Sequence, residues 1–374
     1  MNTRRAETRT RQATFGPRHT PHNVHRTYPI TTKRRCPRPP APGPIVPAAI
    51  GVSERISLSR VPLGPCTVNV AARWPGPSPS SWVALLSVQK AEQRRARHAA
   101  MATASTLGLA VDDGVVLNDS NRLVVRLMPC DVVARVVPLG YRVFPEAVGA
   151  EREVEVVRRL AVAEAPIAAL EPRVEPRVFV RDGFEVELLS YYEPVPRQAL
   201  RPEDYANALK RLHGAMRQVD VEAPHFTDRV ADVQQWIASR DATPDLTDED
   251  RELLVHTLRS LRQSVVDRGA PEQLLHGEPH PWNVLDTQSE PLFVDFENCV
   301  RGPVEWDLGW VPVAVSERYS GADRDLVVWC RGLVLAVVAA HGWRPEDERP
   351  GRESAVVFLN AVRKGPPWSA LDDL

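Results

Sequence analysis

Short apolar runs separated by polar turns fill the stretch of chain that follows residue 88. Asp182-Gly183, which lies between two of these runs, is typical of a tight hairpin turn. Residues 146–163 carry apolar side chains at helical spacing, and residues 91–107 are compatible with a helix. This part of the chain is therefore predicted to form a small β-rich unit. The runs with strand-like composition are residues 122–127, 132–137, 177–180 and 184–189.

Helical periodicity dominates from residue 202 onward. Thr247 and Asp250 approximate a capping box at the start of one helix, and Gly269 ends it. The apolar stretch 326–340 is too short to span a bilayer and contains Arg331, so it predicts a buried core helix. A larger helical unit is expected here. Its predicted helices are residues 203–218, the segment between Thr247 and Gly269, and a last long helix over residues 323–341.

The beginning of the chain has a different composition. Residues 1–80 are rich in Pro and Arg and lack a sustained apolar period. Such a segment cannot bury enough apolar surface to offset its ordering entropy. Residues 1–87 are therefore predicted to be a disordered extension. Two alternatives are a targeting or binding arm, and sequence that precedes a later true start such as Met101.

Charge and cysteine content narrow the class of protein. Residues 1–90 hold 14 Lys and Arg against two acids, whereas the remainder holds 33 bases and 46 acids. A nucleic-acid reader usually carries its basic patch within the folded part, so nucleic acid is an unlikely partner. The five cysteines are scattered and never form a C-x-x-C pair, which argues against a disulfide framework or a zinc cluster. With no signal-type or membrane-spanning segment, a cytoplasmic location is expected.

An irregular stretch before the last long helix contains the most unusual chemistry. Glu278 follows His276-Gly277, Asn283 comes five residues after Glu278, and Asp295 twelve residues after Asn283. A hairpin between these last two side chains would bring an amide oxygen and a carboxylate together as hard ligands for Mg²⁺ bound to phosphates. A nearby carboxylate could then deprotonate an alcohol. Kinases that transfer phosphoryl groups carry these residues in the same order along the chain: first the catalytic base, then a metal-binding Asn, then a metal-binding Asp.

This stretch resembles the aminoglycoside phosphotransferase family, whose kinase-like fold is shared with choline and homoserine kinases. The family pattern is H-G-D-x-x-x-x-N-[VIL]-L, followed by D-x-[DE] after a strand. The resemblance covers about residues 90–345, including Leu212-His213 and the segment 305–309, whose Asp307 is implied to buttress the catalytic loop. The matching positions in the pattern are His276, Gly277, Asn283, Val284, Leu285, Asp295 and Glu297.

The resemblance implies an α+β, bilobal protein-kinase-like fold. Residues 88–193 would form the nucleotide-binding N-lobe, and residues 194–374 a mostly helical C-lobe with the catalytic loop and the acceptor site. The implied activity is transfer of the γ-phosphate of ATP, with Mg²⁺, to a hydroxyl group of an aminoglycoside-like or other small molecule. The sequence leaves the acceptor and the oligomeric state open.

Each matching residue has an implied role. Glu278 would accept the proton of the acceptor hydroxyl, and His276 would hold the loop by hydrogen bonds. Asn283 and Asp295 would bind Mg²⁺. Glu297 would be either an auxiliary metal ligand or a carboxylate that supports the ligands indirectly.

Two positions depart from the family. Glu278 replaces the catalytic Asp and is one methylene longer. A shift of about 1 Å can cost on the order of 10²-fold in rate, yet a reshaped loop can absorb the extra length. A working base is favoured, and the alternative is a kinase-like nucleotide- or metabolite-binding protein with weak or no turnover. Trp282 stands where the family has a small residue, either narrowing the acceptor pocket or packing against the C-terminal helices.

The phosphate anchor is a third departure. Kinases use a Lys on the third strand, but this chain has no Lys between residues 91 and 209. Arg135 is the single charge in the apolar run 132–137, and such a charge is seldom tolerated unless it is paired. Glu153 is the residue of the following helix that best matches the family's Glu, so the resemblance implies that it pairs with Arg135. Arg135 is then predicted to bind phosphate oxygens. The alternative is an edge-strand Arg that points into water.

Two further nucleotide contacts are expected from position alone. Residues 118–121 stand where a phosphate-covering turn would be, and Ser120 and Asn121 are its expected contacts. Residues 189–192, with Tyr191, would form the hinge that offers backbone groups to adenine. An ordinary turn and an ordinary strand end are the alternatives.

Overall fold

A computed structural model describes residues 79–119, 122–140, 149–193, 195, 200–344 and 349–368. All of them belong to one compact unit, Arg73–Leu374. The predicted extension, apart from its last residues, lies outside this description. So do Ser120 and Asn121.

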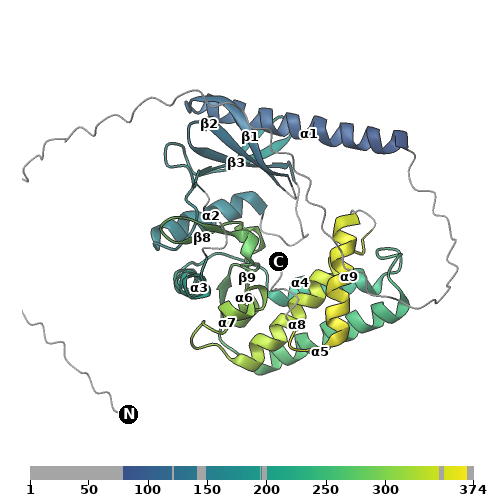
Figure 1. Ribbon diagram of the computed structural model, residues 1–374. Coiled ribbons are helices and arrows are strands. Elements are labelled where there is room, and N and C mark those ends of the chain that lie inside the picture. Colours follow the sequence, from purple (N-terminus) through teal and green to yellow (C-terminus); the bar gives the residue numbers. More distant parts are fainter. Residues whose placement is uncertain are drawn as a thin grey trace, which may run out of the picture. The chain divides into compact units, whose positions relative to one another are not determined.

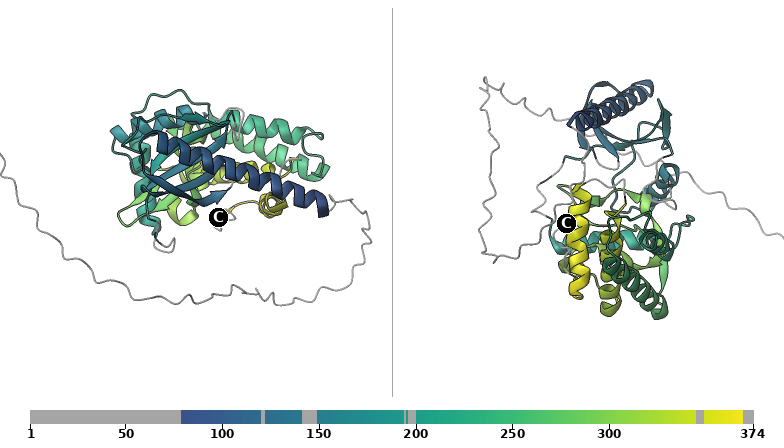
Figure 2. Two further views of the ribbon diagram at one scale, coloured as in Figure 1. Left: turned by 90° about the horizontal axis from the view of Figure 1, so that it is seen from above. Right: turned by 90° about the vertical axis from the view of Figure 1, so that its right-hand side faces the viewer.

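The N-lobe is a five-stranded antiparallel sheet with the order β1-β2-β3-β5-β4. Helix α1 packs across one side of the sheet and α2 lies on the other (Figure 1), and the view from above shows α1 running over the strands (Figure 2). The buried face toward α1 includes Val125, Val132 and Ala134. The elements are α1 (Pro79–Thr106), β1 (Val111–Asp119), β2 (Leu123–Pro129), β3 (Val132–Pro138), α2 (Gly149–Val162), β4 (Phe179–Arg181) and β5 (Phe184–Ser190).

The four strand runs predicted from the sequence correspond to β2 to β5. Asp182 and Gly183 both have positive φ, as the predicted hairpin turn requires. Strand β1 was not predicted, because its sequence contains Asp, Gly and Asn, which are depleted in strands. Helix α1 begins at Pro79, before residue 88 where order was expected to start.

The C-lobe is mainly helical and has two apolar cores. One core lies among α4, α5, α8 and α9, and the other joins α2 and α3 to the segment after Leu274. The elements are α3 (Pro202–Met216), α4 (Phe226–Ala238), α5 (Asp248–Arg268), β6 (Glu272–Leu275), η2 (Pro281–Asn283), β7 (Val284–Asp286), β8 (Pro291–Phe293), η3 (Phe296–Asn298), β9 (Val300–Pro303), α6 (Val304–Trp310), α7 (Val313–Ser316), α8 (Arg324–His341) and α9 (Arg349–Lys364).

The cap signals read from the sequence are present in the C-lobe. The Thr247 hydroxyl accepts the Asp250 amide at the start of α5, and Gly269 ends that helix in a left-handed conformation. Helix α8 is buried along most of its length, as predicted. The prediction that α8 is the last long helix is wrong, because α9 follows it and packs against it.

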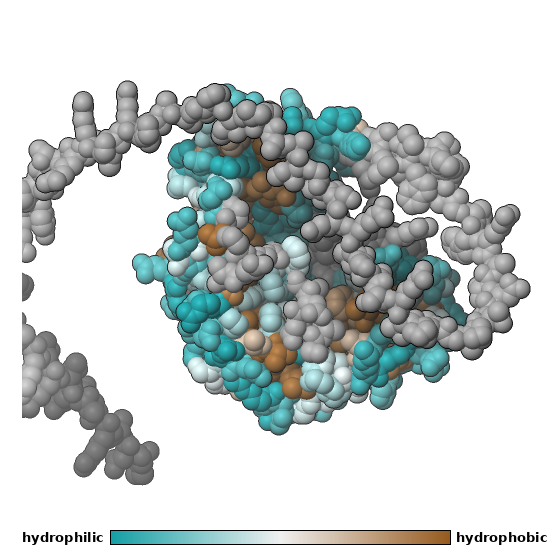
Figure 3. All heavy atoms as spheres, in the orientation of Figure 1, coloured by the Kyte–Doolittle hydropathy of each residue, from teal (hydrophilic) through white to brown (hydrophobic). Residues whose placement is uncertain are grey.

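Helix α4 was also missed. Its N-cap is His225, a residue type without the usual capping preference, which forms a capping box with Asp228 in the first turn. No helix among the described residues is long and apolar enough to cross a membrane. On the face drawn in Figure 3, polar residues surround small apolar groups.

Candidate active site

One buried carboxylate, that of Asp307, binds the backbone of the segment 276–278. Asp307, on α6 and fully buried, accepts the amides of His276 at 3.0 Å and Gly277 at 2.9 Å. It also bonds His213 Nε2 on α3 at 3.0 Å. The Trp306 indole donates to the Gly277 carbonyl at 3.2 Å. Asp307 therefore supports the loop, and it is not a helix cap, because the N-cap of α6 is Pro303.

His276 is completely buried and ties the loop to the following hairpin. Its Nε2 bonds the Val294 carbonyl at 2.9 Å, and its Nδ1 accepts the Glu278 amide at 3.4 Å. Burial lowers the pKa of the ring, so the neutral form is favoured. These bonds match the loop-holding role expected from the sequence.

The carboxylate of Glu278 is fixed at both oxygens. Oε1 accepts from Arg229 Nη1 at 2.9 Å, and Oε2 accepts from the Asn298 amide at 3.0 Å. Burial raises the pKa of Glu278, and Arg229 partly opposes that rise. Neither partner was anticipated from the sequence.

Asn283 and Asp295 lie at the base of the predicted hairpin. Strands β7 and β8 pair Val284 with Phe293, and the Val294 amide donates to the Asn283 carbonyl at 3.0 Å. The side-chain amide of Asn283 donates to the Glu278 carbonyl at 3.0 Å. These bonds connect the loop of Glu278, Asn283 and the residue preceding Asp295 in one hydrogen-bonded unit.

Asp295 also contacts the N-lobe. Its Oδ1 accepts from Arg135 Nη2 at 2.7 Å, and its side chain remains 29% exposed. Although burial raises the pKa of Asp295, Arg135 and Arg122 together hold it below its ordinary value. The residue has φ of +71°, at the point where the chain turns into η3.

Arg135 and Glu153 form the pair that the sequence predicted. Arg135 Nη1 donates to Glu153 Oε1 at 2.5 Å, and both side chains are buried. Glu153 Oε1 also accepts the Phe296 amide at 2.9 Å, so α2 is attached to η3. The alternative of an edge-strand Arg in water is excluded by this burial and by the position of β3 inside the sheet.

A second arginine joins this network. Arg122, directly before β2, bonds Glu297 and lies 2.9 Å from Glu153. Its Nη1 is 3.6 Å from Glu187 on β5. Glu297 is thus the partner of Arg122, which favours the supporting role for this carboxylate over that of auxiliary metal ligand. Apart from its position before an apolar strand, no feature of the sequence indicates a role for Arg122.

The network holds more acids than bases. Two guanidinium groups face the carboxyl groups of Glu153, Glu187, Asp295 and Glu297. Burial raises the pKa of Glu187 to about 8 and that of Glu297 to about 7. Protons on these groups compensate the excess negative charge at neutral pH.

This titration predicts that the free protein loses stability as pH rises from about 5 to 8. The folded state binds a proton on Glu187 that the unfolded chain, with an ordinary carboxyl pKa, has already released. Urea unfolding at several pH values measures the effect. Glu187→Gln should flatten the pH dependence. Glu155→Gln is the control, because Arg158 and Arg159 lower the pKa of Glu155 to about 2. An unchanged slope in Glu187→Gln would contradict the assignment.

The donor set suits Mg²⁺ held jointly with a phosphate. One carboxylate and one amide oxygen are hard ligands, and Mg²⁺ commonly uses one or two protein oxygens with phosphates and water. The amide oxygen of Asn283 is the atom not used in its bond to Glu278. Among the described residues, no group of three or more His, Cys, Asp and Glu side chains is arranged to hold a metal.

The structure also describes two further residues considered in the sequence analysis, Tyr191 of the expected hinge and Trp282 of the loop after Glu278. The Tyr191 amide donates to the Asp131 carbonyl at 3.0 Å, so this backbone group is used inside the N-lobe. The Tyr191 ring stacks on Arg126, whose Cζ is 3.7 Å from the ring centroid. Trp282 is 62% exposed, which does not fit the alternative of packing against the C-terminal helices.

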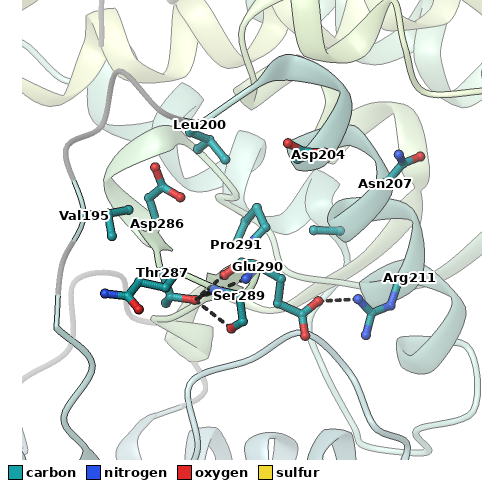
Figure 4. A pocket seen from close by; sticks show the side chains of 12 residues that line it. Val195, Leu200, Asp204, Asn207, Arg211, Asp286, Thr287, Ser289, Glu290 and Pro291 are labelled. Atoms are coloured by element: carbon teal, nitrogen blue, oxygen red, sulfur yellow. Dashed lines mark hydrogen bonds and ion pairs between the residues drawn. The ribbon is translucent and has the colours of Figure 1, made fainter.

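A cavity of about 450 Å³ lies at the other end of the β7–β8 hairpin. It is lined by α3, by the hairpin turn, and by Val195 and Leu200, which precede α3 in the chain; Arg211 pairs there with Glu290 (Figure 4). None of the residues that line this cavity belongs to the segment 276–283, which carries Glu278 and Asn283.

The fold and this site define a kinase-like phosphotransferase architecture. The profile of the phosphotransferase enzyme family (APH) matches residues 112–355, and the chain belongs to this family. The resemblance seen in the sequence is thereby confirmed. Comparison with curated proteins gave no match.

Solved structures share the fold at low sequence identity. A choline/ethanolamine kinase family protein from Mesorhizobium loti aligns with a TM-score of 0.54 and 18% identity, over 76% of this chain and 98% of that one. Amicoumacin kinase hAmiN, in complex with AMP-PNP and Ca²⁺, aligns with a TM-score of 0.57 and 12% identity, over 75% and 97%. The GDP complex of aminoglycoside 2'-phosphotransferase-IIIa gives 0.54 and 14%, over 71% and 96%. The predicted α+β, bilobal kinase-like fold is confirmed.

Proposed function

We propose that this protein transfers the γ-phosphate of ATP to a hydroxyl group of a small molecule. The main support is that Glu278, Asn283 and the strand end before Asp295 form one hydrogen-bonded unit, while Arg135 bonds Asp295 from the N-lobe. Family membership supports phosphotransfer, and similar folds in complex with AMP-PNP or GDP support a nucleotide as donor.

The side chains divide the chemistry among them. Glu278 orients the acceptor hydroxyl and takes its proton as the hydroxyl oxygen bonds to the γ-phosphorus. The bond from the γ-phosphorus to the β–γ bridging oxygen breaks, and ADP leaves. Arg135, fixed by Glu153, presents a rigid fork of N–H donors to the phosphate oxygens. His276 and Asp307 keep the loop in register with the hairpin.

Asn283 and Asp295 would hold Mg²⁺, with Glu297 supporting the site through Arg122. When bound, the ion neutralises charge on the phosphates. The acceptor would be a small molecule, and the acidity of the chain beyond residue 90 favours a cationic one such as an aminosugar.

The test is ADP release by the full chain with ATP and Mg²⁺ across a panel of aminoglycosides and amino alcohols. Wild type is expected to release ADP with at least one acceptor and to yield a phosphorylated product. Glu278→Gln keeps the shape but removes the base, and should lower kcat by about 10² to 10⁴-fold. Arg229 can still donate to the amide oxygen of the variant.

Isothermal titration separates this proposal from a nucleotide-binding protein without turnover. Binding of ATP with Mg²⁺, together with equal background turnover in wild type and Glu278→Gln, would favour the binding protein. An absence of ATP binding by wild type would remove the nucleotide site altogether.

A further inference from the structure

Arg229 is a buried arginine on the apolar face of α4. It is 2% exposed and lies on the same helical face as the buried Phe226, Val230 and Val233. Its Nη1 donates to Glu278 Oε1 at 2.9 Å, and its Nη2 to the Asn298 carbonyl at 3.2 Å. A buried guanidinium is costly unless a carboxylate pairs with it, so this contact accounts for its position.

Asn298 binds the second oxygen of the Glu278 carboxylate. Its side-chain amide donates to Glu278 Oε2 at 3.0 Å, so α4 and η3 each hold one oxygen. The backbone of Asn298 also lies directly against Gly277, where an added Cβ would be 1.8 Å from the Asn298 carbonyl oxygen. Because Gly277 packs directly against the backbone of Asn298, the backbone of the loop lies at a fixed distance from Asn298, which donates to Glu278 and whose carbonyl accepts from Arg229.

The length of the side chain at 278 matches this arrangement. An aspartate would draw the carboxylate back by one C–C bond, about 1.5 Å, beyond hydrogen-bond distance of donors that now lie at 2.9 and 3.0 Å. We propose that Arg229 is the positioning residue that makes glutamate the functional base here, so that restoring the family's aspartate impairs the enzyme. This inference rests on the proposed function of Glu278.

Electrostatics support the geometry. Burial raises the pKa of Glu278, as do Asp295 after β8 and Asp307 on α6, whereas Arg229 on α4 lowers it. The Asn298 amide also favours the charged form. Arg229 and the Asn298 amide both oppose the rise in the pKa of Glu278 that burial causes, and their bonds fix the position of its carboxylate.

The experiment is a double-mutant cycle with Glu278→Asp and Arg229→Gln in the full chain. Glu278→Asp is expected to lower kcat by about 10²-fold in the wild-type background and by far less when Arg229 is already replaced. Arg229→Gln should move the acidic limb of the kcat/KM profile to higher pH. Arg229→Lys, which keeps the positive charge, should move it by less.

Arg251→Gln is the matched control. Arg251 is a buried arginine of the same lobe whose bonds go to the Thr243 hydroxyl and to backbone carbonyls such as that of Leu246. It should lower the unfolding midpoint without moving the pH profile. A Glu278→Asp enzyme at least as active as wild type, or a pH profile unchanged by Arg229→Gln, would overturn the inference.

Two readouts do not need turnover. The carboxyl pKa of Glu278, followed by ¹³C NMR and assigned with Glu278→Gln, should rise in Arg229→Gln. The unfolding midpoints of the four proteins in the cycle should be non-additive. If wild type shows no turnover, the proposed function fails and these readouts still decide whether Arg229 positions Glu278.

Discussion

Gly277→Ala is expected to lower the free energy of unfolding by about 3 kcal/mol or more and to abolish turnover. Gly277 has φ of +90°, and its Cβ would lie 1.8 Å from the carbonyl oxygen of Asn298. Both atoms belong to the backbone or are rigidly attached to it, so no side-chain rotation relieves the overlap. The loop would have to leave η3 and strain its bonds to Asp307 and Trp306. Chemical denaturation with an activity assay measures both effects.

Substitutions at two other glycines distinguish the cost of a positive φ from the cost of steric overlap with a neighbouring atom. Gly183 also has positive φ but nothing within 4 Å, so Gly183→Ala should cost only about 1 to 2 kcal/mol. Gly214 lies within α3 with nothing within 4 Å, and Gly214→Ala should be neutral or stabilise by up to about 1 kcal/mol. If Gly277→Ala cost no more than Gly183→Ala, the contact with Asn298 would not constrain the loop.

Asp295→Asn is expected to reduce Mg²⁺-dependent ATP binding and turnover by about 10³-fold while the fold stays intact. The substitution keeps the shape of the side chain and removes the charge that would face the metal. Arg135 retains Glu153 at 2.5 Å, so no buried guanidinium loses its last partner. Because the network has an excess of carboxyl groups, the free energy of unfolding should change by less than about 1 kcal/mol.

Asp286→Asn is the control for this prediction. Asp286 lies on β7 of the same hairpin, and the change is chemically identical. It should leave ATP affinity unchanged in isothermal titration. Equal affinity of wild type and Asp295→Asn for ATP with Mg²⁺ would contradict a metal-binding role for Asp295.

The local parts of the site could be predicted because they depend on short stretches of sequence. The β7–β8 hairpin follows from two apolar runs separated by a polar turn, and its register brings Asn283 to Val294. Desolvation indicated that Arg135, a single charge in an apolar strand, needs an opposite charge. That Glu153 supplies this charge was implied by the family resemblance.

The long-range partners could not be predicted in this way. Arg229 lies 49 residues from Glu278, and Arg122 lies 175 residues from Glu297. No periodic pattern says which distant element will lie against a given carboxylate. Arg229 did carry a signal, since it is a charge on the apolar face of α4, but α4 itself was missed for lack of a typical N-cap. Strand β1 was missed because its polar residues conceal its pairing with β2.

The ion pairs between Arg135, Arg122, Asp295 and Glu297 have a consequence for ligand entry. The guanidinium groups come from the N-lobe and the carboxylates of residues 295 and 297 from the C-lobe, so the protein's own charges fasten the two halves together. A polyanion bound by those guanidinium groups would compete with the carboxylates for their N–H donors. Ligand binding at these arginines is therefore expected to weaken the ion pairs that connect the two lobes.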